Sequence, residues 1–350
     1  MNEFQRDIER FLRTGTGDFE TFSLKLFSYQ FEKNLPYQAY CRSLEQTPAS
    51  VKRWQDIPAV PIRSFKSVQF ATFSVGHCAA LFQSSGTTQK TPSRHYLKTL
   101  TYYEEAVKKS FREHVLHDDV KRPMFILTPP PSEALHSSLT WMFEVVKNKW
   151  GTTDSSYFVQ RGQLDTPRLT FLMGKTVQKG LPVVLLGTTL AYLKLFEDLE
   201  KSGNTLPLPL DSVLLDTGGM KTAQRDVTRE EFIALAKRYL DLDEKQCVNE
   251  YGMCELSSQF YGRGSSSWLQ GPPWVRTRVI HPDTGKDAAQ GKTGLLQHVD
   301  LANVDSVMAI QTEDVGRMED DGFYLLGRAQ GADLKSCSLA AERFFERPTA

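Results

Sequence analysis

The alternation of short apolar segments with longer amphipathic ones, between about residue 95 and residue 260, constrains this chain most. Apolar runs typical of buried strands occur at 124–128, 181–186, 213–215 and 247–249. Helical patterns occur before and between them, at 102–116, 137–149, after Pro167, at 191–201 and at 232–240. Strands that alternate with helices of this length form βαβ units, whose strands pair in parallel. Ligands of such sheets bind at the carboxyl ends of the strands.

The pattern changes after about residue 274. Segments 275–280, 294–299 and 323–326 are apolar or alternating, and turn residues such as those at 282–285 and 320–322 separate them. This spacing predicts an antiparallel β subdomain. We therefore predict an α/β fold with mostly parallel sheets flanked by helices. Its expected parts are a helical and loop-rich segment at 1–80, an α/β ligand-binding core at 81–273, and a β-rich subdomain with its tail at 274–350.

Composition excludes several classes of function. The 42 basic and 42 acidic residues give a formal net charge of zero, which argues against a nucleic-acid or anionic-membrane partner. The longest apolar run, 181–190, is interrupted and shorter than the ~20 residues that a membrane-spanning helix needs. The N-terminus lacks the pattern of a secretory signal, and the five scattered cysteines form neither a disulfide framework nor a zinc motif. We expect a cytoplasmic protein with free thiols and no membrane insertion.

The segment Gln83–Arg94, QSSGTTQKTPSR, is the strongest local signal for a ligand. Backbone N–H groups of a glycine-containing loop bind phosphate, hydroxyl side chains add donors, and Lys90 or Arg94 supplies positive charge. The sequence does not decide which of these two cations serves. The P-loop pattern GxxxxGK[ST] is absent, which disfavours a P-loop kinase or ATPase. The alternative interpretation is a polar surface linker.

Two further motifs follow predicted strands. NEYGMCE at 249–255 contains Glu255, whose carboxylate oxygen suits Mg²⁺, and Tyr251, whose ring can face a purine. DTGGM at 216–220 contains paired glycines, which allow a backbone to approach a ligand closely. An ordinary strand-end turn is the alternative interpretation in both cases.

A fourth pair of motifs lies in the C-terminal subdomain. TEDVG at 312–316 and LGR at 326–328 place Asp314 and Arg328 on either side of a predicted hairpin. This carboxylate and this guanidinium are candidates for holding a ribose diol and a phosphate or carboxyl group. A surface salt bridge across the hairpin is the alternative.

The order of these motifs resembles that of the adenylate-forming enzymes, which include acyl- and aryl-CoA ligases, luciferases and peptide-synthetase adenylation domains. SSGTT, YGMCE and LGR carry the resemblance, which runs from about residue 80 to 340. Within that superfamily the chain is most similar to the acyl-protein synthetases of the bacterial bioluminescence fatty-acid reductase complex. The tail GADLKSCSLAA at 331–341 and HSSL at 136–139 support this narrower resemblance.

The resemblance implies a reaction of a carboxylic acid, a fatty acid above all, with MgATP to give an acyl-adenylate and pyrophosphate. It implies that Glu255 binds Mg²⁺, that Asp314 binds the ribose hydroxyls, and that Arg328 lies near the ribose and phosphate. The residues implied for the β- and γ-phosphates are Ser84, Ser85, Gly86, Thr87 and Thr88, with Lys90 as a candidate cation. Those implied for the adenine side are Gly218, Gly219 and Tyr251, with Gly252, Met253 and Cys254 as further nucleotide-binding candidates.

The chain departs from the superfamily pattern at three places. The loop has Ser93 where the superfamily carries its lysine, and Cys254 replaces the threonine of YGxTE. Thiols are weaker hydrogen-bond donors than hydroxyls, so a contact from Cys254 to the α-phosphate would be weaker than that of the threonine. Only 22 residues follow Arg328, so we expect the mobile C-terminal domain of the full-length enzymes, with its catalytic lysine, to be absent.

The resemblance also suggests the acyl acceptor. Cys337 lies 13 residues from the end in a motif similar to that of the acyl-protein synthetases, whose C-terminal cysteine accepts the acyl group before a partner reductase takes it. Lys335, in the same motif, is a further candidate catalytic residue. The alternative for Cys337 is a buried apolar role. His136 is a candidate for the acyl pocket or a structural residue at a helix start, and we expect the other histidines on the surface.

These observations leave three functions open. The first is an acyl-adenylate-forming enzyme that loads Cys337, and the second is an aryl- or acyl-CoA ligase that releases a soluble thioester. The third is an inactive nucleotide- or acyl-binding module, which the altered loop and Cys254 favour. The sequence does not identify the acid or the final acceptor.

Overall fold

The computed structural model describes residues 3–84, 91–218, 227–329 and 344–345. The chain forms two compact units that each combine separate segments. The first unit contains Met1–Lys109, Met253–Gln259 and Leu269–Ala350, and the second contains Ser110–Gly252 and Phe260–Trp268. Along the sequence, each of the four motifs falls within one unit or at the border of one.

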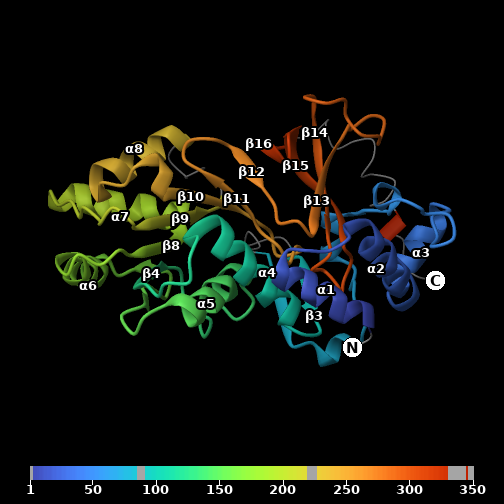
Figure 1. The fold of residues 1–350 in the computed structure, drawn as a ribbon, viewed down its shortest axis with the longest axis horizontal. Helices are drawn as coiled ribbons and strands as arrows, with labels where there is room; N and C mark the ends of the chain where they lie inside the picture. The colour runs from blue at the N-terminus through green and yellow to red at the C-terminus, as the bar shows by residue number, and fades with distance from the viewer. Residues whose placement is uncertain (1–2, 85–90, 219–226, 330–343, 346–350) are drawn as a thin grey trace. The chain divides into compact units, whose positions relative to one another are not determined.

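The second unit is built on the predicted parallel sheet (Figure 1). Its strand order is β11-β10-β9-β8-β4-β5, and all neighbours are parallel except β10 and β11. The bounds are β4 Met124–Leu127, β5 Ser156–Tyr157, β8 Val184–Thr188, β9 Val213–Thr217, β10 Cys247–Tyr251 and β11 Phe260–Arg263. Short strands β6 (Val159–Gln160) and β7 (Gln163–Leu164) form a separate hairpin.

Helices flank this sheet where the amphipathic patterns predicted them. They are α5 Ser138–Trp150, α6 Thr166–Gln178, α7 Thr189–Ser202 and α8 Arg229–Leu240, with a 3₁₀ turn at Glu244–Gln246. Apolar residues of α6, α7 and α8 pack on Phe125, Leu185 and Leu214 of the strands to form a buried core. Figure 1 shows α5 on the other side of β4 and β8 from α7 and α8. The sheet is therefore covered on both faces, as apolar parallel strands require.

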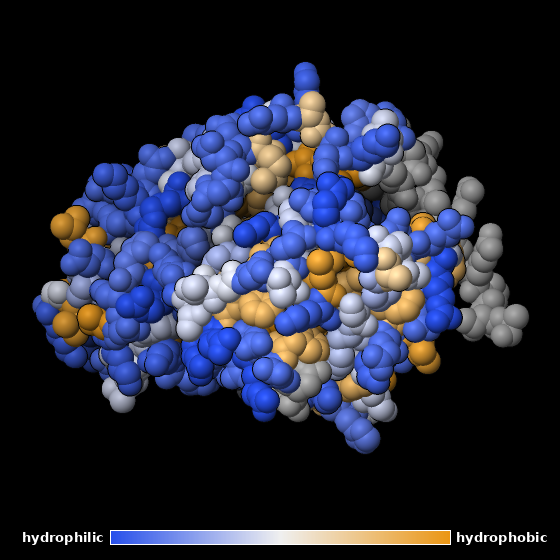
Figure 2. Space-filling view, turned by 45° about the vertical axis from the view of Figure 1, so that its right-hand side comes forward, coloured by the Kyte–Doolittle hydropathy of each residue, from blue (hydrophilic) through white to orange (hydrophobic). Residues whose placement is uncertain are grey.

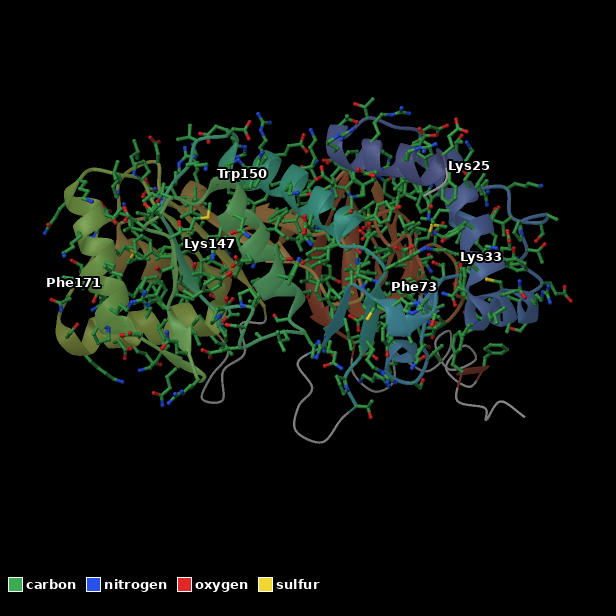
Figure 3. All side chains as sticks on the ribbon, turned by 90° about the horizontal axis from the view of Figure 1, so that it is seen from below. Lys25, Lys33, Phe73, Lys147, Trp150 and Phe171 are labelled. Atoms are coloured by element: carbon green, nitrogen blue, oxygen red, sulfur yellow. The ribbon has the colours of Figure 1, made fainter. Side chains whose placement is uncertain are left out.

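Aromatic side chains on these helices are either buried in the unit or exposed on its surface. Trp150, near the end of α5, is 2% exposed and stacks on Phe111, with ring centroids 6.0 Å apart (Figure 3). Phe171 of α6 is exposed instead, and Lys175 lies over its ring (Figure 3). On the face shown in Figure 2, hydrophilic residues predominate and apolar ones lie in separate groups between them.

The first unit contains the predicted antiparallel subdomain. Strands β13 to β16 pair in sequence order, each antiparallel to the next, and β1 pairs in parallel with β15. A separate hairpin joins β2 and β3. The bounds are β1 Val60–Pro61, β2 Ala80–Gln83, β3 Arg94–Leu97, β13 Val275–Ile280, β14 Thr293–Asp300, β15 Ala309–Glu319 and β16 Gly322–Arg328; β12 (Trp268–Gln270) contains the border between the units.

Helices of the first unit lie mainly near its N-terminus. They are α1 Glu3–Thr14, α2 Phe19–Lys33 and α3 Leu35–Ser43, with 3₁₀ turns at Trp54–Asp56, Ile62–Lys66 and Val75–His77. Helix α4, Thr101–Phe111, contains the border between the units and continues into a π-helical turn at Arg112–Leu116 of the second unit. Within the described ranges, every helix is too short or too polar to cross a bilayer.

Candidate functional site

The base of the β2–β3 hairpin holds the two ends of the predicted phosphate-binding motif together. Gln83 pairs with Arg94, and Ser84 Oγ accepts a hydrogen bond of 3.0 Å from the Ser93 backbone N–H. The Ser84 N–H donates in turn to the Ser93 carbonyl, at 3.3 Å. The other predicted phosphate-binding residues, Ser85, Gly86, Thr87, Thr88 and Lys90, lie outside the described residues.

Arg94 is partly buried at this base. Its Nη2 donates to the Lys66 carbonyl at 3.3 Å, whereas its buried Nε has no hydrogen-bond partner within the part of the chain that the structure describes. A buried donor without a partner costs about 1–3 kcal/mol. Arg94 is therefore held at the base of the hairpin with one donor unsatisfied.

His95, the next residue of β3, contacts the second motif. Its Nδ1 donates to the Cys254 carbonyl at 2.8 Å, and this orientation follows because a carbonyl oxygen only accepts. Burial lowers the pKa of His95 to about 4, so the imidazole is neutral near pH 7. His95 is 1% exposed and His298 is fully buried, so the prediction that these histidines lie on the surface is wrong. Both belong to strands, and the pleat turns their side chains inward.

A buried polar cluster holds the same segment from the turn after β14. Asn303 Nδ2 donates to the Glu255 carbonyl at 2.8 Å, and Asn303 Oδ1 accepts the Ser257 N–H at 2.9 Å. Asp300 accepts the N–H of Ser258 at 2.9 Å and its hydroxyl at 2.8 Å. Burial raises the pKa of Asp300 to about 6, partly offset by these hydrogen bonds. The chain from Cys254 to Ser258 is therefore fixed on two sides.

The side chains of Cys254 and Glu255 are both buried, with 7% and 4% exposed. Burial raises the pKa of the Cys254 thiol well above its ordinary value, and the neighbouring Glu255 carboxylate raises it further. Among the described residues, no three histidine, cysteine or acidic side chains are grouped to hold a metal ion. A single carboxylate fits Mg²⁺, because this ion takes one or two protein carboxylates and completes its shell with phosphate and water oxygens.

In the second unit, the carboxyl ends of the adjacent strands β9 and β10 bring the start of DTGGM next to the start of NEYGMCE. Thr217 pairs with Glu250 in the strand register, and its hydroxyl donates to the Glu250 carboxylate. Gly218 follows with a φ of +96°, a conformation that side chains rarely adopt, so this turn requires glycine. Tyr251 ends β10 with its ring centroid 5.7 Å from that of Phe260. The adenine-side candidates Gly218 and Tyr251 thus end adjacent strands, while Gly219 lies outside the described residues.

Asp216 anchors these strand ends. Its carboxylate is fully buried and accepts hydrogen bonds from Arg229 Nη1 at 2.5 Å, Thr189 Oγ1 at 3.1 Å and Asn249 Nδ2 at 3.2 Å. A buried carboxylate needs such partners because desolvation of an unpaired charge is costly. Asp216 therefore has a structural role at this edge, which the sequence motif DTGG did not distinguish from a ligand-binding role.

Replacing Glu250 by glutamine is expected to remove a pH dependence of stability. Burial raises the pKa of Glu250 from its ordinary 4.5 to about 7, and the nearby Asp216 carboxylate adds to this effect. Between these pH values the folded state retains a proton that the unfolded state releases, so wild-type stability falls as the pH rises. The stability advantage of Glu250→Gln should grow by on the order of 3 kcal/mol between pH 4.5 and pH 8. Urea unfolding at both pH values measures it, and parallel pH profiles would contradict it.

Asp314 and Arg328 are cross-strand partners. They pair in the register of β15 and β16, and Arg328 Nε lies 3.3 Å from Asp314 Oδ1. The arginine side chain is 76% exposed and the aspartate side chain 13%. The hairpin pair that the sequence predicted is thus present. An ion pair this exposed contributes about 0–1 kcal/mol to the free energy of unfolding, so the stability of the fold does not by itself require both residues.

The remaining candidates lie elsewhere. His136 is exposed in the turn before Ser137, the N-cap of α5. Gly252 and Met253 follow Tyr251 directly, at the border between the two units. Lys335 and Cys337 lie outside the described residues.

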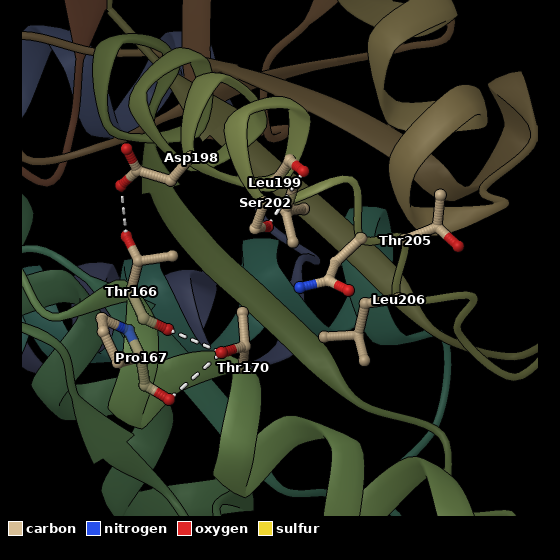
Figure 4. A pocket seen from close by; sticks show the side chains of 9 residues that line it. Thr166, Pro167, Thr170, Asp198, Leu199, Ser202, Thr205 and Leu206 are labelled. Carbon is tan, nitrogen blue, oxygen red and sulfur yellow. Dashed lines mark hydrogen bonds between the residues drawn. The ribbon is translucent and has the colours of Figure 1, made fainter.

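A pocket of about 450 Å³ in the second unit contains none of the predicted residues (Figure 4). Helices α6 and α7 and the loop after α7 line it. Its polar groups are partly paired with one another: Thr166 donates to Asp198 at 2.6 Å, and Thr170 donates to the Thr166 carbonyl at 2.9 Å (Figure 4). The motifs rather than this pocket therefore define the candidate site.

Comparison with solved structures shows which known folds this one resembles. The ATP-bound crystal structure of MatB from Rhodopseudomonas palustris has a TM-score of 0.51 and 15% identity, and the match covers 73% of this chain and 49% of MatB. The chain thus spans about half the length of that protein. A 2-hydroxyisobutyryl-CoA ligase with 2-HIB-AMP and CoA has a TM-score of 0.63 and 12% identity, covering 88% of this chain and 74% of the ligase. These likenesses confirm the predicted α/β fold.

Sequence comparison gives the family. A long-chain-fatty-acid–luciferin-component ligase from Vibrio harveyi is 22% identical over 331 residues, which cover 91% of this chain and 86% of that ligase. The family described as "Acyl-protein synthetase, LuxE" matches residues 17–345. The predictions of an acyl-activating ligase and of the acyl-protein synthetase resemblance are confirmed by this match. The chain belongs to the LuxE family of acyl-protein synthetases.

Proposed function

We propose that this protein activates a fatty acid with ATP and Mg²⁺ as an acyl-adenylate, and then transfers the acyl group to its own Cys337. The family match supports acyl activation, and the name of the Vibrio harveyi relative supports a long-chain fatty acid as the substrate. The ATP-bound MatB structure supports ATP as the second substrate.

One observation carries the proposal for the site. The 2.8 Å hydrogen bond from His95 to the Cys254 carbonyl joins the base of the β2–β3 hairpin to the segment that contains Glu255. Two motifs that are 159 residues apart at this contact, and that the sequence assigned to phosphate and to Mg²⁺, are thereby held side by side. A triphosphate and the metal ion bound to it would need a phosphate-binding motif and a metal-binding motif that are adjacent.

In the proposed first step, a carboxylate oxygen of the acid attacks the α-phosphorus of ATP. The bond between the α-phosphorus and the bridging oxygen breaks, and pyrophosphate leaves with the electron pair. Mg²⁺, when bound, would neutralise phosphate charge. Glu255 would bind this ion, while Ser84, the loop residues 85–88, and Lys90 or Arg94 would donate to the β- and γ-phosphates. Gly218, Gly219 and Tyr251 would border the adenine, and Asp314 and Arg328 would contact the ribose and phosphate.

In the proposed second step, the Cys337 thiolate attacks the acyl carbonyl carbon, and AMP leaves with the electrons of the acyl–oxygen bond. Thiolates are strong nucleophiles, and a thioester remains reactive enough for a further transfer. Lys335 and His136 stay candidates for this half of the reaction. A partner acyl reductase would receive the acyl group, and the four cysteines within the described residues, which are all free, support a cytoplasmic location.

The test is ATP–pyrophosphate exchange with a panel of carboxylic acids. Exchange that depends on a long-chain fatty acid and on Mg²⁺ is the expected result. CoA-dependent AMP formation without labelling of the protein would favour the CoA-ligase alternative. Absence of exchange with every acid would favour an inactive binding module and contradict the proposal.

A further inference from the structure

We propose that His95 is a positioning residue whose Nδ1–H, together with Asn303, sets the direction of the Glu255 side chain toward Mg²⁺. This inference rests on the proposed function, in which Glu255 binds that ion. His95 itself is 1% exposed and donates to a backbone carbonyl, so it is suited to act through Glu255 rather than on a ligand.

The geometry follows from the two peptide planes on either side of Glu255. His95 binds the carbonyl oxygen of Cys254, which lies in the plane before the Glu255 Cα. Asn303 binds the carbonyl oxygen of Glu255, which lies in the plane after it. Because peptide units are planar, a hydrogen bond to the oxygen of each plane restrains φ and ψ of Glu255, and with them the direction of its Cα–Cβ bond.

The two anchors come from different elements. Asn303 lies in the turn after β14, and this turn is itself held by Gln30, which donates to the Asn303 carbonyl at 2.6 Å. His95 lies on β3, in register with Phe82 of the hairpin that carries the predicted phosphate-binding segment. The His95 bond is therefore the contact that couples the position of Glu255 to that hairpin, whereas the Asn303 bond couples it to the β14–β15 turn.

The experiment compares three substitutions at one position. Asparagine places an amide N–H near the position of Nδ1, glutamine places it near Nε2, and leucine removes the donor. The Mg²⁺ requirement of His95→Asn should stay within about 3-fold of that of the wild type. His95→Gln and His95→Leu should raise the Mg²⁺ requirement about 10- to 100-fold, the usual cost of losing a residue that orients a metal ligand.

Two readouts measure this requirement. The first is the Mg²⁺ concentration that gives half of the ATP-dependent rise in unfolding temperature, and the second is the Mg²⁺ concentration for half-maximal ATP–pyrophosphate exchange. The matched control is His298→Leu, because His298 is also a buried strand histidine of the first unit, and its Nδ1 bonds the Thr277 hydroxyl at 2.9 Å where that of His95 bonds the Cys254 carbonyl. This control should lose stability without changing the Mg²⁺ requirement.

The outcomes separate the two proposals. The role of His95 would be overturned if the asparagine and glutamine variants had equal Mg²⁺ requirements, or if the Mg²⁺ requirement rose equally in the His298→Leu control. In either case, exchange by the wild type would still uphold the proposed function. If the leucine variant fails to fold, the asparagine and glutamine pair still decides. Wild-type protein that shows no exchange would refute the proposed function, and the inference falls with it.

Discussion

Replacing Glu255 by glutamine is expected to lower fatty-acid-dependent ATP–pyrophosphate exchange by about 10²- to 10³-fold. An amide keeps the shape of the side chain but removes the negative charge that would bind Mg²⁺, and the loss of one preorganised charge-stabilising group in an enzyme has this magnitude. Glu255 is only 4% exposed, so water would screen its charge little. Initial exchange rates at saturating Mg²⁺ measure the effect.

The control for this prediction is Glu144→Gln. Glu144 makes hydrogen bonds of 2.6 Å with Tyr157 and 2.9 Å with Lys147 in the second unit, and none of these three residues is a candidate for the site. The chemical change is the same but lies outside the candidate site. The exchange rate of Glu144→Gln should therefore stay within about 2-fold of the wild-type rate. A Glu255→Gln variant with full exchange at low Mg²⁺ would show that the metal is bound elsewhere.

The second large effect is expected for Cys337→Ser. This variant should lose the covalent fatty-acyl label completely while retaining ATP–pyrophosphate exchange, because the adenylation step precedes the thiol. A serine hydroxyl is a far weaker nucleophile than a thiolate at neutral pH. The measurement uses labelled fatty acid, ATP and Mg²⁺, and release of the label by neutral hydroxylamine identifies a thioester.

The other cysteines supply the control. Burial raises the pKa of Cys41 and of Cys247 to about 12 and that of Cys254 further, so these thiols remain protonated and unreactive. Cys78 is partly exposed, and Cys78→Ser should keep the full label. Undiminished labelling of Cys337→Ser would place the acceptor on another residue, whereas loss of exchange would implicate Cys337 in adenylation.

The local sequence predicted most of the secondary structure, with informative exceptions. The spacing of threonine and glutamate at Thr228 and Glu231 predicts a capping box, and these residues form one at the start of α8. The same spacing at Thr101 and Glu104 predicts a second capping box, but α4 begins at Thr101, whose N–H bonds the hydroxyl of Thr99 instead. The two threonines are close in sequence, and their propensities do not decide which one stands outside the helix.

The strand β15 shows a second kind of limit. Its residues Ala309–Glu319 include TEDVG, whereas the apolar pattern predicts strands only at 275–280, 294–299 and 323–326. Register with β14 and β16 stabilises this strand, and a register shift between Leu295 and Gln297 adapts its pairing. These cross-strand interactions involve residues that are distant in the chain, so local strand propensity underestimates the stability of β15.

The sequence by itself determined the alternation that gives a parallel α/β sheet, the order of the motifs, and the family to which they belong. Only the tertiary structure showed that His95 and Asn303 hold the Glu255 segment and that Asp216 is neutralised by Arg229. The physical reason is range. Apolar periodicity acts between neighbours along the chain, whereas a buried donor finds its acceptor only after strands far apart in sequence have packed together.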